Sequence, residues 1–286
     1  MGGPSSEREV SLRSGAAVAK GLREAGYDVA EMDIRGHDVE PPAGVEAAFI
    51  ALHGEFGEDG QVQAILDRRR LPYTGSGPEA SRASFDKVET KKRCGRLGIP
   101  TPEYEILERG GKRKVALPVV IKPARQGSSI GVNRVMQESE WEAAFADSLA
   151  YDRQVIVERY IPGRELTVGI VGREALPVIE IVPPGGWYDY KAKYTKGASQ
   201  YLVPAPLDAS VALRCQELSI RTFDALGCRG LARVDFRMSP DGDLWVLELN
   251  NIPGFTETSL LPKAAAQAGM TFPALCDRIM DLAGTE

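Results

Sequence analysis

The stretch ARVDFRMSPDGDLWVLELN, residues 232–250, carries more information about the fold than any other part of the chain. Its two halves alternate between polar and apolar residues, as β-strands do, and the Pro-Asp-Gly sequence between them is a turn signal. In a hairpin that is symmetric about this turn, Asp235 pairs with Glu248, and Arg233 pairs with Asn250. The stretch therefore predicts two adjacent antiparallel strands with four polar residues in register.

Side chains two residues apart on a strand share a face, so these four polar side chains are expected to lie together. The opposite face is expected to hold the apolar side chains of Val234, Phe236, Leu247 and Leu249. Two carboxylates and an amide oxygen form an all-oxygen set, which suits Mg²⁺ with bound phosphates. The alternative is a solvated hairpin face with cross-strand salt bridges, because such pairs are common.

A second informative segment, VVIKPARQGSSIG, covers residues 119–131. A predicted strand ends at Lys122, and a loop of small residues follows it. Backbone N–H groups in such a loop can bind phosphate oxygens, Ser128 and Ser129 add donors, and Lys122 supplies a point charge. The segment is not a Walker A sequence, and a flexible hairpin loop with a surface lysine is the alternative.

Four further side chains are candidates for nucleotide contact. Lys87 and Lys193 are candidate phosphate ligands, although each alone is also typical of a surface lysine. Glu158 and Glu165 flank an Ile-Pro-Gly turn, where they could hold the amino and hydroxyl groups of a nucleoside. Exposed carboxylates are the alternative for this pair.

Three more positions are candidates for substrate binding. Ser259 is a predicted N-cap, and a helix start with free N–H groups binds carboxylates, although simple capping needs no ligand. His53 follows a predicted buried strand, and ligands bind at the carboxyl ends of parallel strands; a structural loop histidine is the alternative. Glu7 is expected to face the same crevice, unless it is a first-turn carboxylate favoured by the helix dipole.

The composition restricts the class of protein. The chain has 286 residues, of which 43% are hydrophobic and 26% charged, as in a protein with a packed core. Its net charge of −5 makes nucleic acid and anionic membranes improbable partners. The four cysteines form no CxxC pair, and we find neither a membrane-spanning run nor a signal-peptide core. These features predict a cytoplasmic protein.

The pattern of predicted helices and strands changes at about residue 76. Up to about residue 76, helix and strand signals alternate, which predicts a parallel sheet with helices on its faces. Beyond that point the strands read as mostly antiparallel, so the predicted class is α/β joined to α+β. Expected helices cover 9–25, 59–70, 84–97, 139–150 and a final stretch from about 261, and expected strands cover 28–34, 47–52, 71–75, 119–122, 132–136, 154–159 and 165–171.

The opening residues Met-Gly-Gly-Pro-Ser-Ser stand directly before the first predicted helix. In an α/β unit such a glycine-rich turn normally follows a strand. We therefore expect either that the sheet lacks its first strand or that the true start lies upstream.

Taken in order, several segments resemble the D-alanine–D-alanine ligases of the ATP-grasp superfamily, and the resemblance covers nearly the whole chain. The segments are SEREVSL (6–12), HGEFGEDG (53–60), YTGSG (73–77), DK (86–87), KPARQGSSIG (122–131), YDYKAKY (188–194), LGCRGLARVD (226–235) and ELNNIPG (248–254). The resemblance implies an ATP-grasp fold with an N-terminal parallel-sheet domain, here without its first strand. It divides the chain into an N-terminal substrate domain (1–76), a central subdomain (77–157) and a C-terminal subdomain (158–286).

The resemblance also implies an activity, namely the ATP-dependent joining of two D-alanines through an acyl phosphate, for peptidoglycan precursors. ATP and two Mg²⁺ ions, with Mn²⁺ as a substitute, are the implied cofactors. A homodimer with small-molecule partners, D-alanine and ATP, is the implied assembly. Two alternatives stay open, which are another ATP-grasp amino acid ligase, permitted by Asn251 and Thr258, and a nucleotide-binding pseudoenzyme.

Site roles follow from the same resemblance. The implied metal ligands are Asp235, Glu248 and Asn250. The implied nucleotide contacts are Lys87, Lys122, Ser128, Ser129, Glu158, Tyr160, Ile161, Glu165, Lys193 and Asn250. The implied catalytic and substrate residues are Glu7, His53, Ser128, Tyr194, Arg233, Gly254, Ser259 and Leu260. Within this set, Glu7 and Ser128 are implied to hold the first D-alanine, and Arg233 and the Gly254 N–H to stabilise the oxyanion. Ser259 and Leu260 are implied to receive the carboxylate of the second D-alanine. Tyr194 belongs to a closing loop, and its presence favours an amino acid acceptor.

Overall fold

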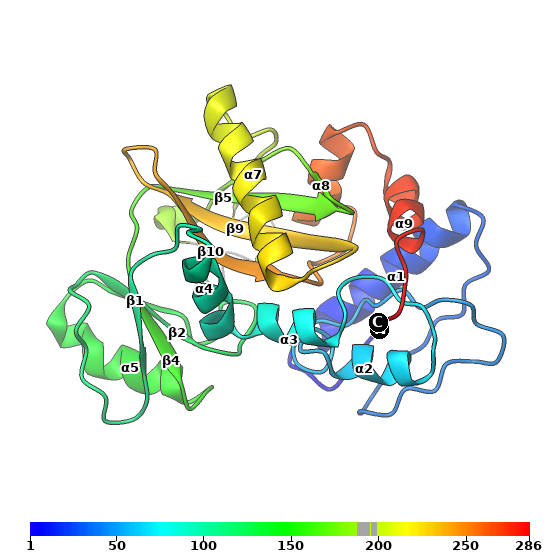
Figure 1. Ribbon diagram of the computed structural model, residues 1–286, viewed down its shortest axis with the longest axis horizontal. Helices are drawn as coiled ribbons and strands as arrows, with labels where there is room; N and C mark the ends of the chain where they lie inside the picture. The colour runs from blue at the N-terminus through cyan, green and yellow to red at the C-terminus, as the bar shows by residue number, and fades with distance from the viewer. Residues whose placement is uncertain (188–194, 196–198) are drawn as a thin grey trace.

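The computed structural model describes residues 1–187, 195 and 199–286. Its smaller sheet is antiparallel, with strand order β1-β4-β2-β3. The strands are β1 (Tyr104–Leu107), β2 (Val119–Pro123), β3 (Asn133–Val135) and β4 (Val155–Arg159). The 3₁₀ turn η1 (Glu138–Glu140) and helix α5 (Trp141–Leu149) follow β3, and α5 packs on this sheet through Trp141 and Phe145 (Figure 1).

The larger sheet has the order β10-β9-β5-β7-β8, and β6 pairs with β5. Its strands are β5 (Arg164–Val171), β6 (Glu174–Ala175), β7 (Ile179–Val182), β8 (Gln200–Leu202), β9 (Leu231–Met238) and β10 (Leu244–Asn250), and η2 (Pro184–Gly186) follows β7. Every pairing in the two sheets is antiparallel, which confirms the prediction for this part of the chain.

Helix α7 (Ala209–Leu226) crosses the larger sheet (Figure 1) and was not among the expected helices. Its residues Leu218 and Phe223 share a core with Leu166, Val234 and Phe236 of the sheet. This face of the sheet is therefore packed in the core. The polar residues of β9 that alternate with Val234 and Phe236 are directed to the opposite face.

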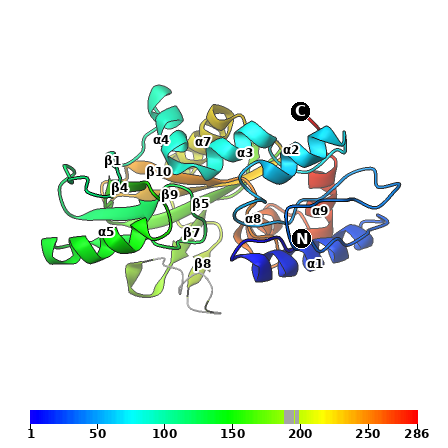
Figure 2. The same ribbon diagram turned by 90° about the horizontal axis from the view of Figure 1, so that it is seen from below.

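The two ends of the chain pack together (Figure 2). Helix α1 (Arg8–Glu24) lies beside α8 (Leu260–Gln267) and α9 (Phe272–Met280), and all three contribute to one core, for example through Leu22, Leu261 and Leu275. The expected final helix is thus two helices. This packing places residues near the N-terminus beside the loop that precedes α8.

The N-terminal sheet is less regular than predicted. In place of strands over 28–34, 47–52 and 71–75, the described residues show single bridges. Two are parallel and join Gly2 to Ile34 and Ala48 to Tyr73, and one is antiparallel and joins Tyr73 to Gly284. The parallel direction agrees with the prediction, but one bridged residue makes no continuous ladder. Residues 1–3 lie beside Ile34, so the expected gap in the sheet is occupied over this short length. Helix α2 (Gln61–Arg68) follows the second of these segments.

The predicted helix over 84–97 is two helices, α3 (Pro78–Phe85) and α4 (Lys87–Arg96). The helix is interrupted at Asp86, which has an extended backbone. The Asp86 side chain accepts hydrogen bonds from the N–H groups of Val88 (2.9 Å) and Glu89 (3.2 Å). A carboxylate in this place is a strong N-cap, so a new helix begins there. The break puts Lys87 at the first position of α4.

None of the helices in the described ranges has the length and apolar character that a membrane span requires. The division of the chain at 76/77 and 157/158 stays a prediction.

Candidate active site

The β9–β10 pair forms the base of the site. The register pairs Asp235 with Glu248 and Arg233 with Asn250, as the sequence predicts. Arg233 donates from Nε and Nη2 to the two oxygens of Asp235, each at 2.8 Å. Thr167 Oγ1 (2.6 Å) and Asn250 Nδ2 (3.1 Å) donate to the same carboxylate, which fixes its plane.

The pairing has a bulge that the symmetric hairpin did not predict. Val246 pairs with Phe236, whereas Glu248 pairs with Asp235, so Leu247 is an extra residue on β10. Two residues on the bulged strand then oppose one on its partner. As a result Leu247 lines the cleft beside Glu248, and the expectation that it faces the core was wrong.

A cleft with about 800 Å³ of empty space lies above this base. It is bordered by β2, β4 and the 126–129 loop on one side and by β5, β9 and β10 on the other. Its lining includes eight of the predicted nucleotide residues, namely Lys87, Lys122, Ser128, Ser129, Glu158, Tyr160, Ile161 and Glu165, together with Asp235 and Glu248. Asn250 is not among the lining residues, but its amide contacts Asp235.

A buried charge cluster lies at the β2–β4 side of the cleft. Glu158 is 3% exposed and contacts Lys122 Nζ at 2.6 Å and Lys91 Nζ at 2.7 Å. Burial raises the pKa of the Glu158 carboxyl, but attraction to Lys122 and Lys91 outweighs burial and holds this pKa below its ordinary value. Burial lowers the pKa of Lys91, whose ammonium also donates to Thr101 Oγ1 at 2.6 Å.

Lys87 joins the 126–131 loop to the β9–β10 base of the cleft. Its Nζ lies 3.3 Å from Glu248 Oε2 and donates to the Gln126 carbonyl at 2.5 Å. The first turn of α4 holds its backbone, so a side chain that is 8% exposed points into the cleft. Lys87, Lys122 and Arg233 place three cations around the carboxylates, an arrangement that favours an anionic ligand.

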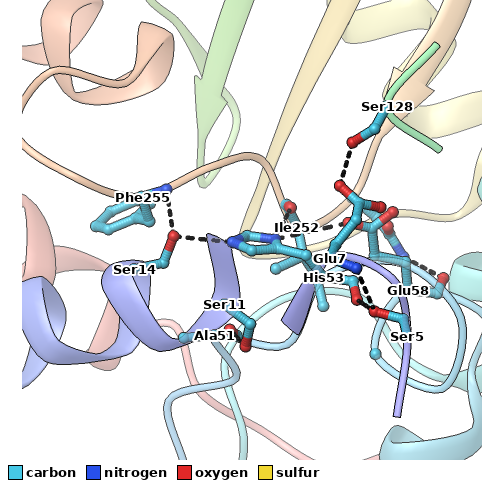
Figure 3. A network of polar contacts seen from close by, with 12 residues as sticks. Ser5, Glu7, Ser11, Ser14, Ala51, His53, Glu58, Ser128, Ile252 and Phe255 are labelled. Atoms are coloured by element: carbon cyan, nitrogen blue, oxygen red, sulfur yellow. Dashed lines mark hydrogen bonds and ion pairs between the residues drawn. The ribbon is translucent and has the colours of Figure 1, made fainter. Parts of the chain in front are cut away.

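The 126–131 loop is tightly curled. Ser128 (φ 54°) and Ser129 (φ 59°) both adopt left-handed backbone conformations. Such residues are strained and cluster at ligand-binding sites. A Cβ at Gly127 would lie 2.8 Å from Glu7 Oε2, so a larger residue there would displace the Glu7 carboxylate. Ser128 Oγ donates to Glu7 Oε1, as Figure 3 shows, and this contact links the N-terminal segment to the cleft.

His53 is 3% exposed, and both of its ring nitrogens are engaged (Figure 3). Nδ1 lies 3.1 Å from the Ile252 carbonyl, and Nε2 lies 2.9 Å from Ser14 Oγ. A carbonyl can only accept, so in the neutral ring Nδ1 donates and Nε2 accepts from Ser14. Ser14 Oγ also accepts from the Phe255 N–H at 3.2 Å. These contacts match the alternative interpretation, a structural histidine, and a direct substrate contact stays a prediction.

The loop before α8 contains the remaining predicted residues. Ser259 is the N-cap of α8, as predicted, but its Oγ accepts from the Thr256 N–H (3.0 Å) and not from a helix N–H. The Leu260 side chain packs in the core, so this residue has only its backbone to offer a ligand. The predicted contacts of Lys193 and Tyr194 lie outside the described residues.

Family models match both parts of the chain. The model described as "D-ala D-ala ligase C-terminus" matches residues 94–281, and the one described as "D-ala D-ala ligase N-terminus" matches residues 33–76. The chain belongs to the D-alanine–D-alanine ligase family.

Individual relatives agree with this D-alanine–D-alanine ligase assignment. The D-alanine–D-alanine ligase of Syntrophotalea carbinolica is 49% identical, with 98% of this chain and 93% of that protein covered. The ligase of Bacillus anthracis in its complex with ATP is 30% identical and superposes with a TM-score of 0.85 over 99% of this chain and 94% of that one. The VanG D-Ala:D-Ser ligase of Enterococcus faecalis is 29% identical, with a TM-score of 0.88 over 99% and 97%.

Within this ligase site, the donor chemistry fits a divalent cation. Asp235, Glu248 and the Asn250 amide would hold the ion with hard oxygen donors, and phosphate and water oxygens would supply its remaining ligands. No cluster of three or more His, Cys, Asp or Glu side chains suited to a metal occurs among the described residues. The set therefore fits a metal that is shared with a nucleotide better than a metal held by protein alone.

The residues of the ligase cleft that the sequence interpretation missed include Arg159, Trp187, Arg237 and Leu247. Arg237 had a signal, because it follows Arg233 and Asp235 at two-residue spacing on one strand and must share their face. Leu247 had none, because a bulge is not visible in the alternation of the strand.

Proposed function

We propose that this protein joins two D-alanine molecules into D-alanyl-D-alanine at the expense of ATP, as a precursor of peptidoglycan. The observation that carries the proposal is the convergence of Arg233, Asp235, Glu248 and Asn250 on one face of the β9–β10 pair at a cation-rich cleft. The family of the chain supports the substrate, and the cleft supports the use of a nucleotide.

In the proposed complex, ATP occupies the cleft. Lys122, Lys87 and the curled loop with Ser128 and Ser129 contact its phosphates, because cations and backbone N–H groups bind phosphate oxygens. Glu158 and the backbone near Tyr160 and Ile161 hold the adenine, and Glu165 holds the ribose. These assignments rest on the placement of the residues along one cleft and on the resemblance in sequence.

Asp235, Glu248 and Asn250 would hold two Mg²⁺ ions, with Mn²⁺ as a substitute. A bound divalent ion neutralises charge that develops on the phosphates. Arg233 donates to both oxygens of Asp235, and these two hydrogen bonds orient the carboxylate.

The reaction has two steps. A carboxylate oxygen of the first D-alanine attacks the γ-phosphorus of ATP, the bond to the bridging oxygen breaks, and ADP leaves. The amine nitrogen of the second D-alanine then attacks the acyl carbon, and a tetrahedral oxyanion forms. This oxyanion collapses with loss of phosphate, and the nitrogen gives up a proton. In this proposal Arg233 and the Gly254 N–H stabilise the oxyanion, as the resemblance in sequence implies.

The amino acids are proposed to enter between the cleft and the loop before α8. Glu7 orients the ammonium group of the first D-alanine, and its hydrogen bond with Ser128 fixes the carboxylate for this task. At the start of α8, Ser259 and the Leu260 N–H receive the carboxylate of the second. Tyr194 favours an amino acid over a hydroxy acid as the acceptor. We further propose that the enzyme is a homodimer in the cytoplasm.

The direct test measures ADP release and dipeptide formation with D-alanine, ATP and Mg²⁺. We expect both products in equal amounts and no ADP release in excess EDTA. D-lactate and D-serine are the comparison acceptors at neutral pH, and a preference for either would replace D-alanine as the acceptor. Nucleotide binding without ADP release would instead show a pseudoenzyme.

The variant Asp235→Asn tests whether the activity depends on the β9–β10 hairpin. We expect Asp235→Asn to lower kcat at least about a hundredfold, a loss of the size seen when one electrostatic contact to a transition state is removed. Its Mg²⁺ dependence should move to higher concentrations. The control is Asp224→Asn on α7, which breaks an exposed pair with Arg173 (2.7 Å) and should leave both unchanged. Full activity of Asp235→Asn would contradict the proposed metal site.

A further inference from the structure

Arg237 is a buried arginine in the cleft that has no role in the scheme above. It is 6% exposed and lines the cleft from the same face of β9 as Asp235. The antiparallel pairing of β5 with β9 sets it directly opposite Glu165. A guanidinium loses hydration on burial, so a buried one needs hydrogen-bond partners.

Its hydrogen-bond partners among the described residues lie in one short segment, 161–165, which covers the turn after β4 and the start of β5. Nε donates to the Ile161 carbonyl at 3.0 Å, and Nη2 donates to the Gly163 carbonyl at 2.9 Å. Nη1 donates to Glu165 Oε2 at 3.2 Å. One planar group therefore holds two backbone carbonyls and a carboxylate, which a lysine could not do, because its single ammonium cannot reproduce this fork.

The segment that Arg237 holds is the one that faces the nucleoside in the proposed complex. Ile161 and Glu165 line the cleft, and the Tyr160 ring centroid lies 5.8 Å from the guanidinium carbon. Gly163 has φ 117°, and a Cβ there would lie 2.1 Å from the Met238 carbonyl, so the turn is pressed against the end of β9. The close approach restricts the backbone of this turn, and Arg237 contacts both the turn and the Glu165 carboxylate that follows it.

We propose that Arg237 is a positioning residue for nucleotide recognition, which orients the Glu165 carboxylate and the 161–163 turn so that the enzyme distinguishes a ribose from a deoxyribose. The inference rests on the proposed function, because it assumes that ATP enters this cleft. Arg237 also stands two residues from Asp235, so one strand positions both the nucleoside end and the metal end of the ligand.

The test is calorimetric binding of ADP, 2′-deoxy-ADP and 3′-deoxy-ADP to the full chain, which needs no turnover. We expect the wild type to bind ADP about tenfold more tightly than at least one deoxy form, the lower end for a hydrogen bond to a charged group. Arg237→Lys and Arg237→Met should reduce this ratio to below about threefold, mainly by weakening ADP. Glu165→Gln should reduce it likewise, and adding Arg237→Lys to Glu165→Gln should change it no further.

The matched control is Arg164→Met. Arg164 precedes Glu165 on β5, and its guanidinium pairs with Glu180 (2.6 Å) and lies outside the nucleotide cleft. This variant should keep the wild-type ratio. If Arg237→Met does not fold, Arg237→Lys decides the question, because it keeps the charge.

Two results would overturn the inference: an unchanged ratio in the Arg237 variants, with or without an equal weakening of all three ligands, or a wild type that does not distinguish them. An equal weakening would mean that Arg237 is merely structural. Failure of the proposed function looks different, because ADP would still bind with the expected ratios while D-alanine gave no dipeptide. A wild type that binds no ADP would overturn both.

Discussion

Glu158 shows how a single residue holds charge at the site. Its two oxygens contact two lysine ammonium groups, and all three side chains are almost wholly buried. An isolated carboxylate in such a place would be protonated, whereas this one is kept ionised by its neighbours. The cluster therefore presents Lys122 to the cleft as a cation in a defined position.

Replacement of Glu158 by Gln leaves two buried lysines without their anion. We expect the free energy of unfolding at pH 7 to fall by about 3–5 kcal/mol, as when one partner of a buried ion pair is removed. The folded pKa of Glu158 lies below its ordinary value of 4.5, so the contribution of the carboxylate is fully present above that pH. It is lost as the pH falls through the folded pKa. The gap between wild type and Glu158→Gln in urea unfolding should accordingly narrow below about pH 4.

Glu89→Gln is the control for this measurement. Glu89 pairs with Arg93 at 2.9 Å on the surface of α4, four residues away. A surface pair of this kind contributes about 0.3–0.5 kcal/mol, so its loss should be small at every pH. Equal losses for the two variants at pH 7 would contradict the buried cluster.

At the scale of the element, the β9–β10 hairpin presents both charged side chains and an apolar side chain to the cleft, because β10 has a bulge at Leu247. Along β9, alternation sends Asp235 and Arg237 to the cleft and Arg233 to the same face, where it contacts Asp235. The residues between them lie in the core beneath α7. On β10 the bulge places Leu247 next to Glu248 on the cleft side. The strand thereby adds an apolar side chain to a charged site, where a flat base could pack.

This difference predicts opposite results for two leucines on one strand. Leu247→Ala should weaken ATP binding severalfold, because the nucleotide loses apolar contact of about 1–2 kcal/mol, and the melting temperature should hardly change. Leu249→Ala, at 3% exposure in the core, should lower stability by about 2–5 kcal/mol and alter ATP affinity much less. Calorimetric titration and thermal melts measure both quantities, and the same pattern in both variants would refute the assigned role of the bulge.

At the scale of the whole molecule, the site depends on contacts between segments far apart in the chain. Ser14 on α1 forms hydrogen bonds with the His53 ring and with the Phe255 N–H (Figure 3). The His53 ring forms a further hydrogen bond with the Ile252 carbonyl. These contacts hold the loop before α8 against the N-terminal segment. Glu7 and the start of α8 are thus fixed relative to each other through buried polar groups.

Ser14→Ala removes the centre of this network. It leaves the Phe255 N–H and the His53 Nε2 atom buried without their partner, at about 1–3 kcal/mol for each group. We expect a lower melting temperature and a raised KM for D-alanine, with the KM for ATP nearly unchanged. Steady-state kinetics with each substrate varied in turn measure this split.

The control is Ser219→Ala in α7. Ser219 is equally buried, but its hydroxyl donates to the Cys215 carbonyl one turn earlier in the same helix, at 2.7 Å. Its loss should lower stability slightly and leave both KM values unchanged. If Ser14→Ala behaved in the same way, the network would have no part in substrate binding.

Local patterns in the sequence determined much of this protein. Alternation along 232–250 predicted which polar residues share a face, and the register confirms it, because side chains in a strand follow backbone geometry alone. The small residues of 126–131 predicted a loop at the cleft for the same local reason. Helix α7 was missed because Ser219 and Thr222 interrupt the apolar pattern of its buried face, where they bond carbonyls one turn back.

The tertiary structure alone decided the bulge at Leu247, the partners of Arg237 and the enclosure of His53. Each depends on atoms from segments that are distant along the chain, such as Ile252 opposite His53. The sequence states the chemical character of a side chain and the direction in which it leaves the backbone. Its neighbours are selected by how whole elements pack, and that selection is a property of the complete fold.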